Sequence, residues 1–265
     1  MKVLKFGGTS VANATNIKLV LDIVQNQAKQ EPLIVVVSAL SKVTDLLQTA
    51  ASKAAAADET YKTLVIEIEK KHLDTIKEFI PVSEQSSLLS HIKRIVNHLE
   101  TLLDGCFLLG ELSPRTADTI LSFGELLSSY IIAEALKQKI PNAGYKDSRE
   151  FIKTNSNFGK AAVNFDVTNI LIADYYKSVA NQVTIMPGFI ASSQDGITTT
   201  LGRGGSDYTA AIIAGALDVA ELEIWTDVNG MFTANPRIVK QAQPIAMISY
   251  QEAMELSHFG AKVLY

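Results

Sequence analysis

The sequence predicts an α/β fold, a three-layer αβα sandwich with a mainly parallel central sheet and a helical insertion. The first observation is a short apolar segment, residues 3–6, which passes through a glycine turn into a helical pattern from Val11 towards Gln30. The second is the segment 33–37, so rich in β-branched residues that both of its faces should be buried, as in a parallel sheet. The third is the alternation of strand-like and helix-like segments in the second half of the chain.

The remaining elements follow from the spacing of apolar residues. Residues 46–103 contain no convincing strand, and their spacing predicts long amphipathic helices separated by Pro81, which form the insertion. Further helices are expected over residues 117–139 and 208–217. Strands are expected at residues 183–186, 198–201, 222–226 and 245–248. No linker rich in Pro, Gly or Ser interrupts the chain, so one domain over residues 1–265 is predicted.

Composition excludes several classes of protein. The 265 residues are 47% hydrophobic and 20% charged, which is ordinary for a folded domain, and their formal net charge is -4. Nucleic acid or an anionic membrane needs a basic field that this chain lacks, so neither is an expected partner. The single Cys106 excludes an internal disulfide, and we find no signal peptide and no apolar run near the ~18 residues of a membrane span. A cytoplasmic protein is therefore expected.

Two glycine clusters stand where a strand is expected to meet a helix, within residues 5–10 and 202–207. Such glycines let backbone amides approach an anion, and the helix N-terminus adds its positive dipole end. Two clusters favour a polyanionic ligand, although neither matches the Walker or the dinucleotide pattern, and a plain tight turn is the alternative for each.

Charged residues beside these turns are candidate ligand contacts. Lys5 stands within an apolar strand and Arg203 stands between glycines, where a long cation is free to reach a ligand. The alternatives are snorkelling of Lys5 from an edge strand and capping of the following helix by Ser206 and Asp207. Glu125, on the expected helix 117–139, is either a buried carboxylate or a surface residue.

A third polar cluster follows the expected strand 222–226 and contains Trp225, Thr226, Asp227, Phe232 and Arg237. Ligands of open α/β sheets bind beyond the carboxyl ends of strands, which favours a site here, and a loop with an Asx-turn at Asp227 is the alternative. The four histidines show no metal spacing, and His91 and His98 are expected to be solvated. No metal ligand set and no Ser-His-Asp or Cys-His arrangement is predicted.

Taken together, these segments resemble the aspartate kinase family, a branch of the amino-acid kinase (carbamate kinase-like) fold. The matching segments, in family order, are residues 5–10, Ser38 with Thr44, residues 122–125, residues 200–208, residues 225–227 with Pro236 and Arg237, and residues 259–264. Segments 11–14 and 249–257 look most similar to the kinase portion of bifunctional aspartokinase/homoserine dehydrogenases. At Tyr265 the sequence departs from many relatives, which have His followed by Pro there. The chain also ends at this residue, so a truncated kinase domain without ACT regulatory or dehydrogenase domains is expected.

The resemblance implies transfer of the γ-phosphoryl group of ATP to the β-carboxylate of L-aspartate, giving 4-phospho-L-aspartate, the first step towards Lys, Thr and Met. A carboxylate with a pKa near 3.9 is already an anionic nucleophile at neutral pH, so no general base is required. Catalysis then depends on lysines, Mg²⁺ and backbone amides that neutralise the phosphoryl group. Magnesium is expected to be held mainly through the nucleotide, with Asp207 a weak candidate ligand, and the full-length protein is expected to be a homo-oligomer.

The resemblance also assigns roles to individual residues. Expected catalytic residues are Lys5, Lys262, Arg203 and Asp207. Expected substrate-binding residues are Ser38 and Thr44 for the β-carboxylate, Arg203 for the α-carboxylate, Glu125 with Asp207 for the α-ammonium, and Ser206. Expected ATP-binding residues are Lys5, Gly7, Gly8, Thr226, Asp227, Phe232, Arg237 and Lys262. The alternatives are another amino-acid or nucleotide kinase of the same fold and a catalytically silent binding module. Arg203 with Glu125 favours an α-amino acid over a uridylate or a carbamate, and the presence of both Lys5 and Lys262 weighs against the silent module.

Overall fold

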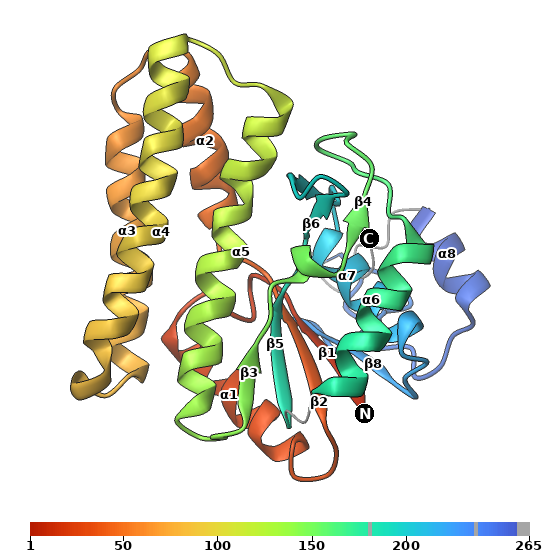
Figure 1. Cartoon of the computed structure of the whole chain (residues 1–265). Coiled ribbons are helices and arrows are strands. Elements are labelled where there is room, and N and C mark those ends of the chain that lie inside the picture. Colours follow the sequence, from red (N-terminus) through yellow and green to blue (C-terminus); the bar gives the residue numbers. More distant parts are fainter. Residues whose placement is uncertain (180–181, 236–237, 259–265) are drawn as a thin grey trace.

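The centre of the molecule is a parallel β-sheet. The computed structural model describes residues 1–179, 182–235 and 238–258. Within them, five strands pair in the order β3-β5-β2-β1-β8, and every pairing is parallel (Figure 1). The strands are β1 (Lys2–Phe6), β2 (Leu33–Val37), β3 (Ala143–Tyr145), β5 (Val183–Pro187) and β8 (Leu222–Trp225). All five residues of β2 are buried, so the prediction that both faces of this strand are covered is confirmed.

Helices cover both faces of this sheet. Alternate residues of a strand point to opposite faces, and in β1 Leu4 belongs to one apolar core while Val3 belongs to a second. The first core is shared with α1 (Ala14–Gln27) and α5 (Pro114–Lys137), and the second with α6 (Phe165–Ser178) and α7 (Gly205–Ala216). The predicted three-layer α/β fold is therefore confirmed.

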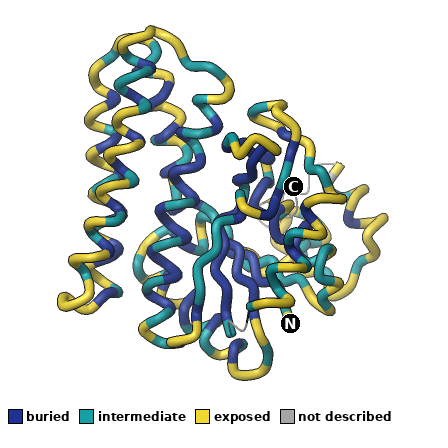
Figure 2. The backbone as a smooth tube through the Cα atoms, viewed as in Figure 1, coloured by how far each residue is buried: buried dark blue, intermediate teal, exposed yellow. Residues whose placement is uncertain are grey.

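The helical insertion is longer than the sequence pattern indicates. It consists of α2 (Val43–Ala55), α3 (Tyr61–Phe79) and α4 (Val82–Leu109), so it spans residues 43–109 and not 46–103. The end of α3 and the start of α4 flank Pro81, as predicted, because proline lacks the N–H that a helix interior needs. Figure 2 shows the buried inner faces and exposed outer faces of these helices, which pack on one another and on α5.

A second, small sheet lies beside the central one. Its strands are β4 (Lys153–Thr154), β6 (Ile190–Ser193) and β7 (Thr198–Thr200), with β6 and β7 antiparallel. A short 3₁₀ helix, η1 (Ser148–Glu150), precedes β4, and α8 (Tyr250–His258) lies near the C-terminus. The strand expected at residues 245–248 is wrong: no described strand lies beside this segment to share a ladder, and Met247 is 91% exposed.

One described helix, α5, is long and apolar enough to cross a membrane by length and composition. The sequence predicts this helix over residues 117–139 but not as a possible membrane span, because polar and charged residues keep its apolar runs short. In the structure, 72% of its apolar window is buried inside the protein, as in the core helix of a globular fold.

A buried histidine in the insertion is expected to make the stability of the fold depend on pH. His72 of α3 is fully buried, its Nδ1–H donates to the carbonyl of Ile68 at 2.7 Å, and its Nε2 has no hydrogen-bond partner. Burial first of all, with Lys71 adding to it, lowers the pKa of His72 to about 4. Because the folded pKa lies below the unfolded value of 6.5, the stability that neutral His72 contributes is fully present above pH 6.5 and is lost as the pH falls towards 4.

We expect this loss to be about 3 kcal/mol in the free energy of unfolding. The His72→Leu variant removes the titrating group and should lose less stability between pH 7 and pH 4 than the wild type does. Urea denaturation at a series of pH values measures how the free energy of unfolding of each protein changes with pH. An equal loss between pH 7 and pH 4 in the two proteins would contradict the lowered pKa of His72.

Candidate active site

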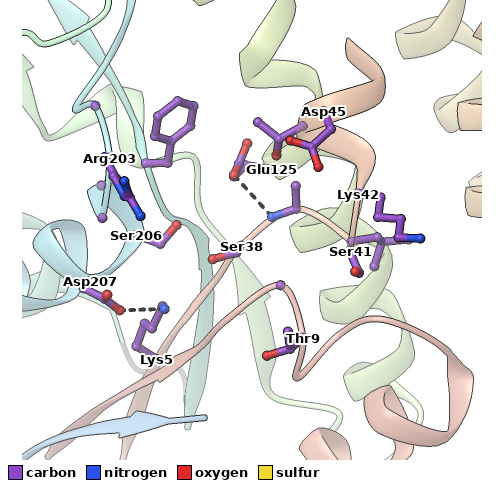
Figure 3. A pocket seen from close by; sticks show the side chains of 18 residues that line it. Lys5, Thr9, Ser38, Ser41, Lys42, Asp45, Glu125, Arg203, Ser206 and Asp207 are labelled. Carbon is purple, nitrogen blue, oxygen red and sulfur yellow. Dashed lines mark hydrogen bonds and ion pairs between the residues drawn. The ribbon is translucent and has the colours of Figure 1, made fainter. Parts of the chain in front are cut away.

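A cavity of about 470 Å³ opens beyond the carboxyl ends of β1 and β2, where ligands of open α/β sheets bind. It brings together residues of both glycine clusters and all six predicted substrate-binding residues (Figure 3). Its lining comprises Lys5, Gly8, Thr9, Ser38, Ala39, Leu40, Ser41, Lys42, Thr44, Asp45, Glu125, Phe189, Gly202, Arg203, Gly204, Gly205, Ser206 and Asp207. Arg203, Ser206 and Asp207 lie on the α7 side, whereas Glu125 and Ser41 lie on the opposite side.

The second glycine cluster forms the N-terminus of α7 at this cavity. Gly202 and Gly204 have φ angles of 76° and 74°, in the left-handed region that favours glycine. The cap residue is Gly204 and no side chain caps the helix, so the alternative in which Ser206 or Asp207 caps it is wrong. The positive end of the α7 dipole therefore adjoins the cavity, where an anion is stabilised.

The first glycine cluster follows β1. A Cβ at Gly8 would lie 3.2 Å from the carbonyl oxygen of Ala39, so this turn approaches the loop after β2 closely. Gly7 does not line the cavity, and a Cβ on it would lie 3.4 Å from the Nζ of Lys5. Gly7 therefore adjoins the Lys5 side chain, whereas Gly8 forms part of the cavity wall.

Lys5 is a buried cation on the interior of the sheet. β1 lies between β2 and β8, so snorkelling from an edge strand is excluded. Lys5 is 9% exposed, and its Nζ lies 2.5 Å from Oδ1 of Asp207 (Figure 3). This ion pair joins the first strand to α7 and holds the ammonium group at the cavity wall. It also gives Asp207 a partner other than a metal ion.

Glu125 is a buried carboxyl group on α5, so the surface alternative is excluded. It is 4% exposed, its Oε1 accepts the backbone N–H of Ala39 at 3.3 Å, and its Oε2 has no hydrogen-bond partner. Burial raises the pKa of Glu125 to about 8 against the smaller opposing effect of the Ala39 hydrogen bond. The group is therefore mostly protonated at pH 7, and a cation bound beside it would favour its ionised form.

The loop after β2 begins with the predicted residue Ser38, and the predicted residue Thr44 lies in the first turn of α2. The hydroxyl of Ser128 on α5 donates to the carbonyl of Ser38 at 2.8 Å, which holds this loop against the helix that carries Glu125. The loop also supplies Lys42, whose φ of 67° is unusual for a residue with a side chain.

Sequence reasoning missed Phe189, which lines the cavity with a φ of 66°. Its ring packs so closely on α7 that a Cβ at Gly205 would lie 2.8 Å from it. Its position directly after Pro187 and Gly188, at the end of a strand, was the available signal.

Of the residues expected to bind ATP, Lys5 and Gly8 line this cavity, whereas Thr226, Asp227 and Phe232 do not. Thr226 and Asp227 line a neighbouring hollow of about 210 Å³ at the end of β8, and Thr9 lines both spaces. The hydroxyl of Thr226 donates to Asp227 at 3.2 Å. Phe232 pairs instead with Pro244 in an isolated β-bridge. Arg237 and Lys262 lie outside the described residues.

Metal-binding clusters are absent from the described part of the chain, where no group of three His, Cys, Asp or Glu side chains could hold a metal ion. The expected solvation of His91 is wrong: it is partly buried, stacks on Tyr130 with ring centroids 4.0 Å apart, and its Nδ1 lies 3.0 Å from a guanidinium nitrogen of Arg94. These contacts give it a packing role.

The fold is that of the amino acid kinase class, and the chain matches the model of the amino acid kinase family over residues 1–265. The chain belongs to this family. It is 34% identical to the chloroplastic bifunctional aspartokinase/homoserine dehydrogenase 1 of Zea mays over 99% of this chain and 29% of that protein. It is 36% identical to the lysine-sensitive aspartokinase 3 of Escherichia coli K12 over 99% of this chain and 57% of that protein.

The fold is also similar to a solved aspartokinase. The crystal structure of E. coli aspartokinase III in complex with aspartate and ADP superposes with a TM-score of 0.89 at 34% identity. That match covers 100% of this chain and 57% of the solved chain. The chain therefore spans between 29% and 57% of the length of these relatives.

Proposed function

We propose that this chain is the kinase domain of an aspartokinase, which transfers the γ-phosphoryl group of ATP to the β-carboxylate of L-aspartate. The observation that carries the proposal is the cavity that places the buried carboxyl of Glu125 opposite Arg203, with Lys5 in the wall between the two glycine turns. An α-amino acid presents an ammonium and a carboxylate, and these two side chains are complementary to it. The complex of the E. coli relative with aspartate and ADP supports this choice of ligand.

The chemistry needs little beyond placement and charge. The β-carboxylate is already a nucleophile at pH 7, in keeping with the absence of a histidine among the residues that line the cavity. Ser38 and Thr44 would position this carboxylate, and Lys5 would neutralise charge on the transferring phosphoryl group. Lys262 is proposed for the same role and Gly8 for cradling the phosphates.

The nucleotide would extend towards Thr226 and Asp227 in the neighbouring hollow. Mg²⁺, when bound with ATP, would supply further charge neutralisation. The described residues suit a metal held through the phosphates, because they offer no three-ligand cluster and Asp207 is paired with Lys5. Location in the cytoplasm and assembly into a homo-oligomer remain predictions, and the Zea mays relative is named chloroplastic.

Trapping with hydroxylamine tests the proposed reaction. With Mg·ATP and L-aspartate, we expect an acyl hydroxamate and ADP to form together, and neither product with succinate, which lacks the ammonium that Glu125 would bind. Turnover with another acceptor but not with aspartate would indicate a different kinase of this fold. Nucleotide binding without turnover would indicate a silent binding module.

A further inference from the structure

A second buried carboxylate lies on α5 outside the cavity. Asp118 is 1% exposed and accepts hydrogen bonds from three donors. Its Oδ2 accepts the backbone N–H of Thr200 at 2.9 Å, its Oδ1 accepts the hydroxyl of Thr200 at 2.9 Å, and both oxygens lie 3.0 Å from the N–H of Gly159. These three donors therefore provide both buried oxygens of Asp118 with hydrogen bonds.

These hydrogen bonds join the two segments that carry Glu125 and Arg203, the residues proposed to bind the ammonium and the α-carboxylate of the substrate. Asp118 and Glu125 are seven residues apart on α5, which places them two turns apart on one face. Thr200 ends β7, three residues before Arg203. Gly159 belongs to a loop that supports the same segment: the N–H of Ala161 donates to the carbonyl of Thr200 at 3.0 Å, and a Cβ at Gly202 would lie 3.3 Å from the Gly159 carbonyl.

We propose that Asp118 is a positioning residue that sets the place of the Arg203 loop relative to Glu125, and so the affinity for the amino-acid substrate. This inference rests on the proposed function, because it assumes that these two side chains bind the α-carboxylate and the α-ammonium. A carboxylate is the group that satisfies three converging donors, since both of its oxygens only accept. Asparagine at this position has one accepting oxygen, and its amide would face at least one of the N–H or O–H donors.

The Asp118→Asn variant should therefore raise the KM for aspartate by at least about tenfold, with kcat and the KM for ATP changed by less than about threefold. The matched control is Thr168→Val on α6. The Thr168 hydroxyl is fully buried and accepts the N–H of Lys153 at 3.0 Å, so its loss also removes a buried hydrogen bond, but away from the cavity. It should lower the melting temperature and leave both KM values unchanged. A merely structural Asp118 would behave like this control.

Two further measurements complete the test. If Asp118 acts through Arg203, then adding Asp118→Asn to Arg203→Ala should raise the KM for aspartate by less than about threefold, whereas independent effects would multiply. Amide hydrogen exchange over residues 200–205 should be faster in Asp118→Asn than in Thr168→Val. Unchanged exchange together with an unchanged KM overturns the inference. If the wild type does not phosphorylate aspartate, the proposed function fails, and the exchange comparison still decides whether Asp118 positions the loop.

Discussion

The Lys5→Met variant is expected to lower kcat by about a hundredfold or more while the KM for aspartate changes by less than about threefold. Lys5 is fixed in the interior of the sheet by β2 and β8 on either side and by its ion pair with Asp207. Its ammonium therefore needs no rearrangement to neutralise charge on the phosphoryl group, and methionine keeps the length of the side chain without the charge. Steady-state kinetics with aspartate and Mg·ATP varied in turn measure both parameters.

Two controls separate catalysis from folding. Lys2→Met changes the same strand outside the cavity, where the Lys2 ammonium pairs with Glu221 at 2.7 Å on the surface, and it should leave kcat unchanged. Lys5→Met also leaves the Asp207 carboxylate without its cation, so the Lys5→Met/Asp207→Asn double variant should recover melting temperature but not rate. A raised KM with normal kcat would instead assign Lys5 to binding.

The fold could be predicted where local patterns are long. The unbroken β-branched run of β2 indicated a strand with two buried faces, and the amphipathic spacing on either side of Pro81 indicated the insertion. The strands β3 and β4 have three and two residues, too few to show a period of two, and they form because a neighbouring strand completes their ladders. The apolar segment 245–248 has the composition of a strand but no partner among the described strands.

The residues of the site could be predicted from the sequence, but the contacts between them could not. Glycine clusters at strand ends located the cavity, because the carboxyl ends of parallel strands meet at one edge of the sheet. The pairing of Lys5 with Asp207 and the contacts of Asp118, whose partners lie 41 and 82 residues away, depend on the tertiary fold. The positive φ of Phe189 likewise arises from packing against α7, since an aromatic residue has no intrinsic preference for that conformation.

The affinity for aspartate is expected to rise with pH. Glu125 has a pKa of about 8 because it is buried, whereas the substrate ammonium requires its ionised form. Binding at pH 7 must therefore release a proton, and the dissociation constant for aspartate should fall by about tenfold between pH 6.5 and pH 8. Calorimetry in two buffers of different ionisation enthalpy should detect about one proton released per aspartate at pH 7.

The matched variant is Glu125→Gln, which has the same shape and cannot ionise. We expect it to raise the KM for aspartate by about tenfold or more at pH 8, to leave kcat at saturating aspartate within about threefold, and to remove both the pH dependence and the proton release. Because the folded pKa of Glu125 lies above its unfolded value of 4.5, its ionisation costs stability as the pH rises from 4.5 to 8, so the Gln variant should melt at a higher temperature than the wild type at pH 8. The higher melting temperature would show that the variant is folded. A large loss of kcat in this folded variant would indicate that Glu125 takes part in the chemical step and not only in substrate binding.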